Sequence, residues 1–356
     1  MLKKILRGFS IIAIILTIAP LFTFDTWFIR MFDFPHVQLS ALTLLAFLLY
    51  YIKFDYKSTS DWTYIALMFT CLSFQIYKVR TFFPFYPEEI KTISTYKKTH
   101  TISLLTSNVL QSNKNKKELL NVISDLDPDV LLFTEVNRDW TTHIKNNITK
   151  DYKYSISFPL KNTYGILMCS KKPLIEAEVN FLVDDSIPSI NTKIKLDNGK
   201  LVQFYGLHPT PPMPQHNPKS TQRDTEFMFI AQNASKSNLP VLVMGDFNDV
   251  PWSSTMQLFK ANSLLLDPRI GRGFYNTYNS ESSFLRWPLD HAYVSKDFRL
   301  IDLKVCKSID SDHFPYYIEL AYSPENSNEQ KPTPPTKQQK ESAKAQIEKF
   351  HKMKRD

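Results

Sequence analysis

Polar side chains that can bind a metal ion or a phosphate follow short apolar stretches at several points between residues 100 and 315. The clearest case is LPVLVMGDFNDVPWSS (Leu239–Ser254), in which an apolar run leads directly to Asp246, Asn248 and Asp249. Asp and Asn are common turn residues because their side chains bond nearby backbone groups. A turn after a buried strand is therefore one interpretation, and a rigid strand that presents acidic groups to a site is the other.

Five further apolar stretches end in the same way. They lead to Asn108, Glu135, His208, the pair Asp290 and His291, and the pair Asp312 and His313. Each group alone has a structural explanation, since a lone Glu at a strand end is usually solvated and a lone His usually packs. Six such endings along one stretch of chain favour a functional site over a set of ordinary turns.

Two short motifs in this region carry a family resemblance. GDFN at 245–248 and SDH at 311–313 are the most specific, supported by the spacing of Asn108, Glu135, His208 and Asp290 and by YGILMCSKKPL (Tyr164–Leu174). Residues 101–322 thereby resemble the endonuclease/exonuclease/phosphatase family, which includes deoxyribonuclease I-like nucleases, abasic-site endonucleases, sphingomyelinases and inositol-polyphosphate 5-phosphatases. The resemblance implies an α+β fold of four layers, with two packed mixed β-sheets flanked by helices.

The resemblance and the chemistry of phosphate-ester hydrolysis together assign roles. Mg²⁺ prefers oxygen ligands, so the expected metal ligands are Glu135, with Asn108 as an amide or phosphate contact and Asp312 as a further or water-mediated contact. Mn²⁺ is an alternative ion. The expected catalytic residues are Asp246 as general base, Asn248 holding the water or a phosphate oxygen, His313 on the phosphate with Asp290 orienting its ring, and His208 donating to a phosphate oxygen.

Other polar residues receive weaker assignments. Arg286 and Trp287 are candidates for a substrate wall, with a packing role as an equal alternative. His143, His216 and His291 are interpreted as structural or surface residues.

The elements that must position these residues are predicted as short strands and helices from residue 101 onwards. The expected strands are 101–110, 127–136, 152–158, 164–170, 189–196, 201–207, 239–246, 291–294 and 316–322. Helical spacing of apolar residues predicts a helix at 116–126, and further helices are expected at 219–235 and 254–262.

Three apolar stretches precede this region, at 8–24, 37–52 and 62–77. Each has about 16 or 17 uncharged residues, at the short end of a transmembrane span, with Trp27, Trp62 and Tyr77 at the edges as interfacial aromatics. A cleaved signal peptide followed by buried helices is the alternative. We expect a membrane anchor at 1–80 with three transmembrane helices, similar to membrane-anchored bacterial family members, and a linker at 81–100.

Basic residues near the three stretches predict the orientation. Lys3, Lys4, Arg7, Lys53 and Lys57 would share one side of the membrane, and they slightly outnumber the basic residues expected on the other. The positive-inside rule then places the N-terminus in the cytoplasm and residues 101–322 outside it, in a multi-pass protein of the cell membrane. Residues 323–356, which are rich in proline and charge, are predicted to be a disordered tail, with a helix near its end as an alternative.

Composition limits the substrate. The formal charge is +8, yet residues 101–322 hold 24 basic and 24 acidic residues, so the excess lies at the two ends. A domain-wide basic surface for nucleic acid is absent. The chain has only seven glycines and contains no glycine-rich phosphate-binding motif. Its three cysteines do not have the spacing of a metal site. The sequence thus predicts a membrane-anchored phosphoesterase acting on a small or lipid-linked phosphoester, with a nuclease or a non-catalytic phosphate-binding scaffold as alternatives.

Overall fold

The structure is a computed structural model that describes residues 2–22, 24–148 and 150–355. Met1, Thr23, Thr149 and Asp356 lie outside the described residues, so one position of the stretch predicted at 8–24 is not covered.

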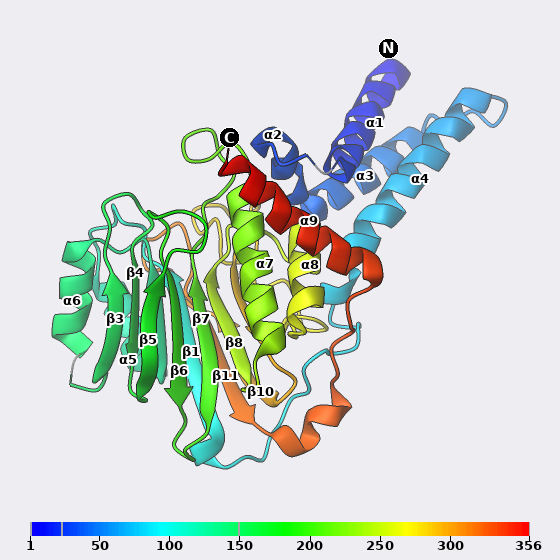
Figure 1. Cartoon of the computed structure of the whole chain (residues 1–356). Coiled ribbons are helices and arrows are strands. Elements are labelled where there is room, and N and C mark those ends of the chain that lie inside the picture. Colours follow the sequence, from blue (N-terminus) through cyan, green and yellow to red (C-terminus); the bar gives the residue numbers. More distant parts are fainter. Residues whose placement is uncertain (1, 23, 149, 356) are drawn as a thin grey trace.

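Two β-sheets pack face to face in the centre of the molecule (Figure 1). The first sheet has the order β10-β11-β1-β2-β4-β3 and the second the order β5-β6-β7-β8-β9. The strands are β1 (Thr101–Asn108), β2 (Val130–Thr134), β3 (Tyr154–Phe158), β4 (Ile166–Ser170), β5 (Leu174–Asn180), β6 (Ser189–Lys195), β7 (Leu201–Leu207), β8 (Val241–Asp246), β9 (Asp290–Val294), β10 (Phe298–Val305) and β11 (Tyr316–Tyr322). The pairs β1/β2 and β7/β8 are parallel and the other pairs are antiparallel, so both sheets are mixed.

The central strands are buried on both faces, which explains their continuous apolar sequences. In β1, Leu104 belongs to the core between the two sheets, whereas Leu105 belongs to the core under the outer helices. Phe204 and Met244 contribute to the inter-sheet core from the second sheet. This alternation follows from the two-residue period of a strand.

Helices cover the outer faces of the sandwich. The helices α5 (Lys117–Leu126) and α6 (Arg138–Ile148) lie on the first sheet, where Val122 and Trp140 join its outer core. The helices α7 (Thr221–Lys236) and α8 (Ser254–Ser263) lie on the second sheet. The predicted arrangement of two packed mixed sheets flanked by helices is therefore confirmed. The sequence did not predict α6, β5 or β10.

The C-terminal segment is structured, unlike the disordered tail expected at 323–356, and its last helix agrees with the alternative of a helical end. It contains a 3-10 turn, η5 (Pro324–Glu329), and the helix α9 (Lys337–Met353), which packs across α7 and α8 (Figure 1). Thr336 caps α9 through a capping box with Gln339. Ala343 and Phe350 are buried and Ile347 packs against the core formed with α7 and α8, so a few apolar positions in a polar sequence dock this helix.

The predicted linker at 81–100 is also fixed to the sandwich. Ile90 is buried in the core between the sheets, and the N–H of Ile93 donates to the carbonyl of Leu300 at 2.9 Å. The N–H of Leu300 in turn donates to the carbonyl of Lys91 at 3.1 Å. Residues 90–93 are therefore held against the sandwich, so the segment is not a free tether.

The N-terminal helices form a bundle that projects from one end of the sandwich (Figure 1). Its members are α1 (Leu2–Ile18), α3 (His36–Tyr51) and α4 (Thr59–Val79), with the short helix α2 (Trp27–Arg30) and the 3-10 turn η2 (Met31–Asp33) between α1 and α3. Among the described residues, no individual helix combines the length and hydropathy needed to cross a bilayer. The segments Trp27–Asp33 and His36–Tyr51 reach that threshold only when taken together, with a bend of 73° between them.

None of the three stretches predicted as transmembrane helices, at 8–24, 37–52 and 62–77, therefore forms a helix that meets this criterion by itself among the described residues. The helices α1 and α3 have 17 and 16 residues, which at about 1.5 Å per residue is short of a hydrocarbon core of about 30 Å. The helix α4 has 21 residues, but Asp61, Gln75 and Lys78 lower its hydropathy. The helix α1 also begins before Lys3, whereas the predicted span began after Arg7.

Candidate active site

Residues from both sheets meet at one end of the sandwich. The parallel register of β1 and β2 places Asn108 opposite Thr134, so that Glu135 follows at the same edge. The Nδ2 atom of Asn108 donates to Glu135 Oε1 at 2.9 Å and to Asp246 Oδ2, on the other sheet, at 3.0 Å. Its Oδ1 accepts from the N–H of Leu110 at 3.0 Å. Asn108 thus joins the two carboxylates as a donor, with its amide oxygen already bonded to the backbone.

Glu135 is held in an unusual backbone conformation at the end of β2. Its φ of 59° lies in the left-handed region, and its Oε2 accepts from the N–H of Gln111 at 3.3 Å. Burial raises the pKa of Glu135, and the negative charges of Asp246 and Asp312 act in the same direction. The hydrogen bonds from Asn108 and Gln111 only partly offset this. A cation bound at the end of β2 would oppose these effects and favour the ionised carboxylate.

Asp246 ends β8 as the sequence predicts, and the glycine before it has a steric reason. A Cβ on Gly245 would lie 2.0 Å from the carbonyl oxygen of Leu207, and its φ is +145°. Asp246 Oδ1 accepts from the N–H of Asn248 at 3.0 Å, while Asn248 Nδ2 donates to the carbonyl of Pro209 at 3.0 Å. The GDFN segment is therefore a turn, and the same turn aims Asp246 at the residues from the first sheet.

His313 and Asp290 form the expected carboxylate–histidine pair. His313 Nδ1 donates to Asp290 Oδ2 at 2.8 Å, and His313 Nε2 lies 3.7 Å from Asp246 Oδ2. Burial opposes the charged imidazolium, yet the carboxylates of Asp246 and Asp290 outweigh burial and raise the pKa of His313 to about 10. His313 is thus a cation between two acids. The ring of Tyr278 lies 4.9 Å from the His313 ring, centroid to centroid.

Ser311 was not singled out from the sequence, although it belongs to the SDH motif. Its Oγ donates to the carbonyl of Asn108 at 2.7 Å and accepts from the N–H of His313 at 3.1 Å. One hydroxyl therefore connects the end of β1 with the loop that carries His313. A hydroxyl next to an Asp-His pair is the local signal that could have indicated this role.

His208 takes a different position from the one expected. It is buried behind Asp246, with its Nε2 3.7 Å from Asp246 Oδ2 and its Nδ1 without a hydrogen-bond partner. Burial lowers the pKa of His208 to about 4, which keeps the ring neutral. His208 contacts the general-base candidate directly, but it does not line the cavity that opens at the site.

A cavity of about 600 Å³ lies over these residues. Six of the eight predicted site residues line it, namely Asn108, Glu135, Asp246, Asn248, Asp312 and His313. His208 and Asp290 lie behind the lining. The predicted wall residue Trp287 faces the cavity and Arg286 does not. His216, interpreted from sequence as structural or surface, also lines it and bonds the Tyr164 hydroxyl at 2.7 Å.

Apolar side chains from the N-terminal region form much of the remaining wall. They are Trp27, Met31, Phe34 and Pro35, which face Tyr278 and Trp287 and the proline-rich loop 211–216. The sequence analysis missed these N-terminal residues as site components, because only tertiary contacts bring residues 27–35 to the ends of β1, β2 and β8.

Among the described residues, one group has the spacing to hold a metal ion through several side chains at once. Asp246, Asp290 and His313 each offer a ligand atom within 4.8 Å of the others, and Asp290 Oδ1 is buried without a partner. This group differs from the expected set of Glu135, Asn108 and Asp312. The all-oxygen set around Glu135 suits Mg²⁺ or Mn²⁺, whereas an imidazole ligand is more typical of later transition metals.

The comparison with protein families identifies the class of protein. A family profile described as "Endonuclease/Exonuclease/phosphatase family" matches residues 105–313, more than half of the chain. The chain belongs to the endonuclease/exonuclease/phosphatase family. The prediction of a hydrolytic enzyme is confirmed at this level, and family enzymes use divalent metal ions. No curated protein sequence matched the chain.

Several solved structures share the fold of the sandwich. TDP2 of D. rerio, in complex with a single-strand DNA product, superposes with a TM-score of 0.52 at 14% identity, covering 62% of this chain and 98% of that one. A mannosyl-6-phosphatase of Bacteroides thetaiotaomicron gives 0.51 at 18%, covering 62% and 100%. The human Nocturnin catalytic domain with bound sulfate gives 0.51 at 16%, covering 64% and 96%. At such identities the likeness concerns the fold alone.

Proposed function

We propose that this protein is a membrane-anchored, Mg²⁺-dependent phosphoesterase that hydrolyses a small or lipid-linked phosphomonoester or phosphodiester. The observation that carries the proposal is the cavity floor, where Glu135, Asp246, Asp312 and His313 face the same space within a region matched to this family. Acids that can bind a cation and accept a proton lie there beside a cationic imidazole, which is the combination that phosphate hydrolysis requires.

The side chains divide the chemistry between them. Asp246 accepts the proton of the attacking water, and its Oδ1 bond to the N–H of Asn248 keeps the carboxylate oriented. His313, held by Asp290, donates a hydrogen bond to a phosphate oxygen. Glu135 and Asp312 would hold the cation, with Asn108 fixing Glu135 in place. When bound, Mg²⁺ would neutralise charge on the phosphate oxygens.

His208 is better suited to support than to phosphate binding. Because it is buried and neutral beside Asp246, it limits the positions that this carboxylate can adopt. We therefore place it as a positioning residue behind the general base.

The helical bundle supports attachment to a membrane. Large apolar side chains are exposed along the sides of α1, α3 and α4, including Ile11, Ile15, Leu44, Leu48 and Phe69. Many large apolar side chains exposed on one bundle are typical of membrane or protein contact sites.

One group of charged residues lies at the far tip of the bundle, whereas Lys78 lies in the last turn of α4, at the opposite end. At the far tip, Asp61 forms ion pairs with Lys3 at 2.5 Å and with Arg7 at 2.8 Å. Apolar sides between polar ends suit a bundle placed in a bilayer, and the distribution of basic residues favours an extracytoplasmic sandwich.

A nuclease is the second candidate, because a structurally similar family member was solved with a DNA product. The balanced charge of residues 101–322 opposes it, since a protein that neutralises several DNA phosphates needs Lys and Arg at the contact. A non-catalytic phosphate-binding scaffold is the third. The presence of Glu135, Asp246, Asn248 and His313 together argues against a scaffold that has lost catalysis.

The test uses the purified full-length protein in detergent. Bis-p-nitrophenyl phosphate should be hydrolysed with Mg²⁺, EDTA should abolish the activity, and added Mg²⁺ should restore it. Plasmid DNA and phospholipid headgroup esters are then compared at matched Mg²⁺ and physiological salt. No hydrolysis of any phosphoester would favour the scaffold, and efficient DNA nicking without turnover of small esters would favour the nuclease.

A further inference from the structure

The cavity has two chemically different parts. Its acidic and imidazole groups are on the floor, whereas its wall contains Trp27, Met31, Phe34, Tyr278 and Trp287. Among the described residues that line it, none is Lys or Arg. A polynucleotide would place further phosphates next to the reacting one, and such phosphates are usually met by basic side chains. The wall therefore favours an apolar group attached to the phosphate.

We propose that residues 27–35 form a hydrocarbon-binding subsite that selects lipid phosphoesters, with Trp27, Met31 and Phe34 as the specificity-determining side chains. This inference rests on the proposed phosphoesterase function and adds the substrate class. The segment lies between α1 and α3, both of which expose large apolar side chains, and Phe28 and Met31 within the segment are exposed as well. A hydrocarbon chain could thus pass from an apolar environment to the floor of the site without crossing charged side chains of the wall.

The segment is bonded to the sandwich by its backbone. The N–H of Trp27 donates to the carbonyl of Pro218 at 2.9 Å, next to an isolated bridge between Thr26 and Lys219. The indole N–H of the buried Trp252 donates to the carbonyl of Asp33 at 2.7 Å. Phe34 also packs edge-on against Trp287, with ring centroids 6.0 Å apart. The wall is therefore an integral part of the site.

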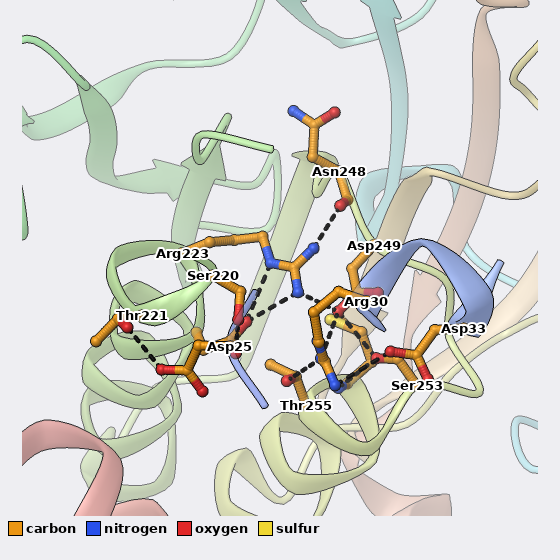
Figure 2. A network of polar contacts seen from close by, with 12 residues as sticks. Asp25, Arg30, Asp33, Ser220, Thr221, Arg223, Asn248, Asp249, Ser253 and Thr255 are labelled. Atoms are coloured by element: carbon orange, nitrogen blue, oxygen red, sulfur yellow. Dashed lines mark hydrogen bonds and ion pairs between the residues drawn. The ribbon is translucent and has the colours of Figure 1, made fainter. Parts of the chain in front are cut away.

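A buried arginine holds the segment from within (Figure 2). Arg30 donates to Thr255 Oγ1 at 2.7 Å and to Ser254 Oγ at 3.2 Å, both at the start of α8, and forms an ion pair with Asp33 at 3.1 Å. Asp249 Oδ2 lies 3.9 Å from Arg30 Nη2. Four contacts around one guanidinium fix the position of Met31 and Phe34 relative to α8.

The same carboxylate connects the wall with the catalytic turn (Figure 2). Asp249 Oδ2 also pairs with Arg223 Nη2 at 3.0 Å, and Arg223 Nη1 donates to the carbonyl of Asn248 at 2.7 Å. Arg30 and Arg223 therefore meet at Asp249, directly after the GDFN turn. This network sets the distance between the apolar wall and the general base, and that distance determines which alcohol fits beside the phosphate.

The test compares two diesters with the same reacting group, methyl p-nitrophenyl phosphate and octyl p-nitrophenyl phosphate. In both, water attacks phosphorus, p-nitrophenolate leaves, and the alkyl phosphate remains. Each buried methylene contributes about 0.8 kcal/mol, a factor of roughly four. If a few methylenes reach the wall, the octyl-to-methyl ratio of kcat/KM should be at least tenfold in the wild type.

Variants locate the selectivity. Met31→Ser and Phe34→Ser should lower the octyl-to-methyl ratio at least fivefold, and Arg30→Met should lower it by loosening the segment. Phe85→Ser is the matched control, since Phe85 is 83% exposed and does not line the cavity. Its ratio should equal that of the wild type. Partitioning of the octyl ester into detergent affects all variants alike, and equal thermal melting would show that the folds are intact.

Each outcome has a distinct meaning. No hydrolysis of either ester would count against the proposed function itself. Hydrolysis of both with a wild-type ratio near one would overturn the subsite while leaving the phosphoesterase intact. If the wild-type octyl-to-methyl ratio is high but Met31→Ser and Phe34→Ser leave it unchanged, the selectivity arises elsewhere. That result would also overturn the proposed subsite. Preferential cleavage of thymidine 5′-p-nitrophenyl phosphate over the octyl ester would show that the aromatic wall stacks bases.

Discussion

Glu226, on the helix that supports the catalytic turn, provides a quantitative test of the structure. It lies one turn after Arg223 on α7, it is 1% exposed, and neither carboxylate oxygen has a hydrogen-bond partner. Burial raises the pKa of Glu226 to about 8. The substitution Glu226→Gln keeps the size of the side chain and removes the titration.

The sign of the pH effect follows from the two pKa values. In the unfolded chain the carboxyl ionises near its ordinary pKa of 4.5, whereas the folded protein retains the proton until about pH 8. Between these values the unfolded state binds fewer protons, so the stability of the wild type falls as pH rises. At about 1.36 kcal/mol per pKa unit, the full effect is roughly 3 to 5 kcal/mol. Glu226→Gln should therefore match the wild type near pH 4.5 and exceed it increasingly up to pH 8.

Thermal unfolding of wild type and variant at pH 5 and pH 8.5 measures this difference. At about 2 °C or more per kcal/mol for a chain of this size, Glu226→Gln should gain at least about 5 °C relative to the wild type between the two pH values. Glu348→Gln is the control, because Glu348 is exposed on α9. Equal melting of wild type and Glu226→Gln at both pH values would mean that Glu226 is hydrated or paired, and would refute the burial argument.

Three further predictions concern activity and topology. Asp246→Asn should retain the fold, because Asn keeps the acceptor for the N–H of Asn248, and should lower turnover at least about a hundredfold. Substitution of the exposed Asp185 to Asn is the control. An unchanged rate for Asp246→Asn would exclude Asp246 as the general base. Glu135→Gln should sharply raise the Mg²⁺ concentration for half-maximal activity; an unaltered Mg²⁺ requirement would remove Glu135 from the metal site. Reporter fusions after residue 90 should be active in the extracytoplasmic compartment; cytoplasmic activity would reverse the proposed orientation.

The sequence alone determined the strands that carry the site. A buried strand needs a continuous or alternating apolar run, which is a local property, and 201–207 and 316–322 match β7 and β11 residue for residue. Polar groups at the ends of such runs are equally local, so Asn108, Glu135 and Asp246 could be proposed before their contacts were known. By contrast, β5 is largely exposed and contains Glu176 and Glu178, which explains why its sequence did not indicate a strand.

Tertiary structure decided everything that depends on which distant segments meet. The helix α9 is polar in sequence, and its apolar residues Ala343, Ile347 and Phe350 find α7 and α8 to pack against only in the folded protein. Residues 27–35 appeared only as the connection between two apolar stretches. They become a wall of the active site because Arg30 and Arg223, nearly two hundred positions apart, pair with the same Asp249 carboxylate. The type and spacing of side chains can be read from the local sequence. The burial, the ion pairs and the pKa values of those side chains depend on residues that only the fold brings near them.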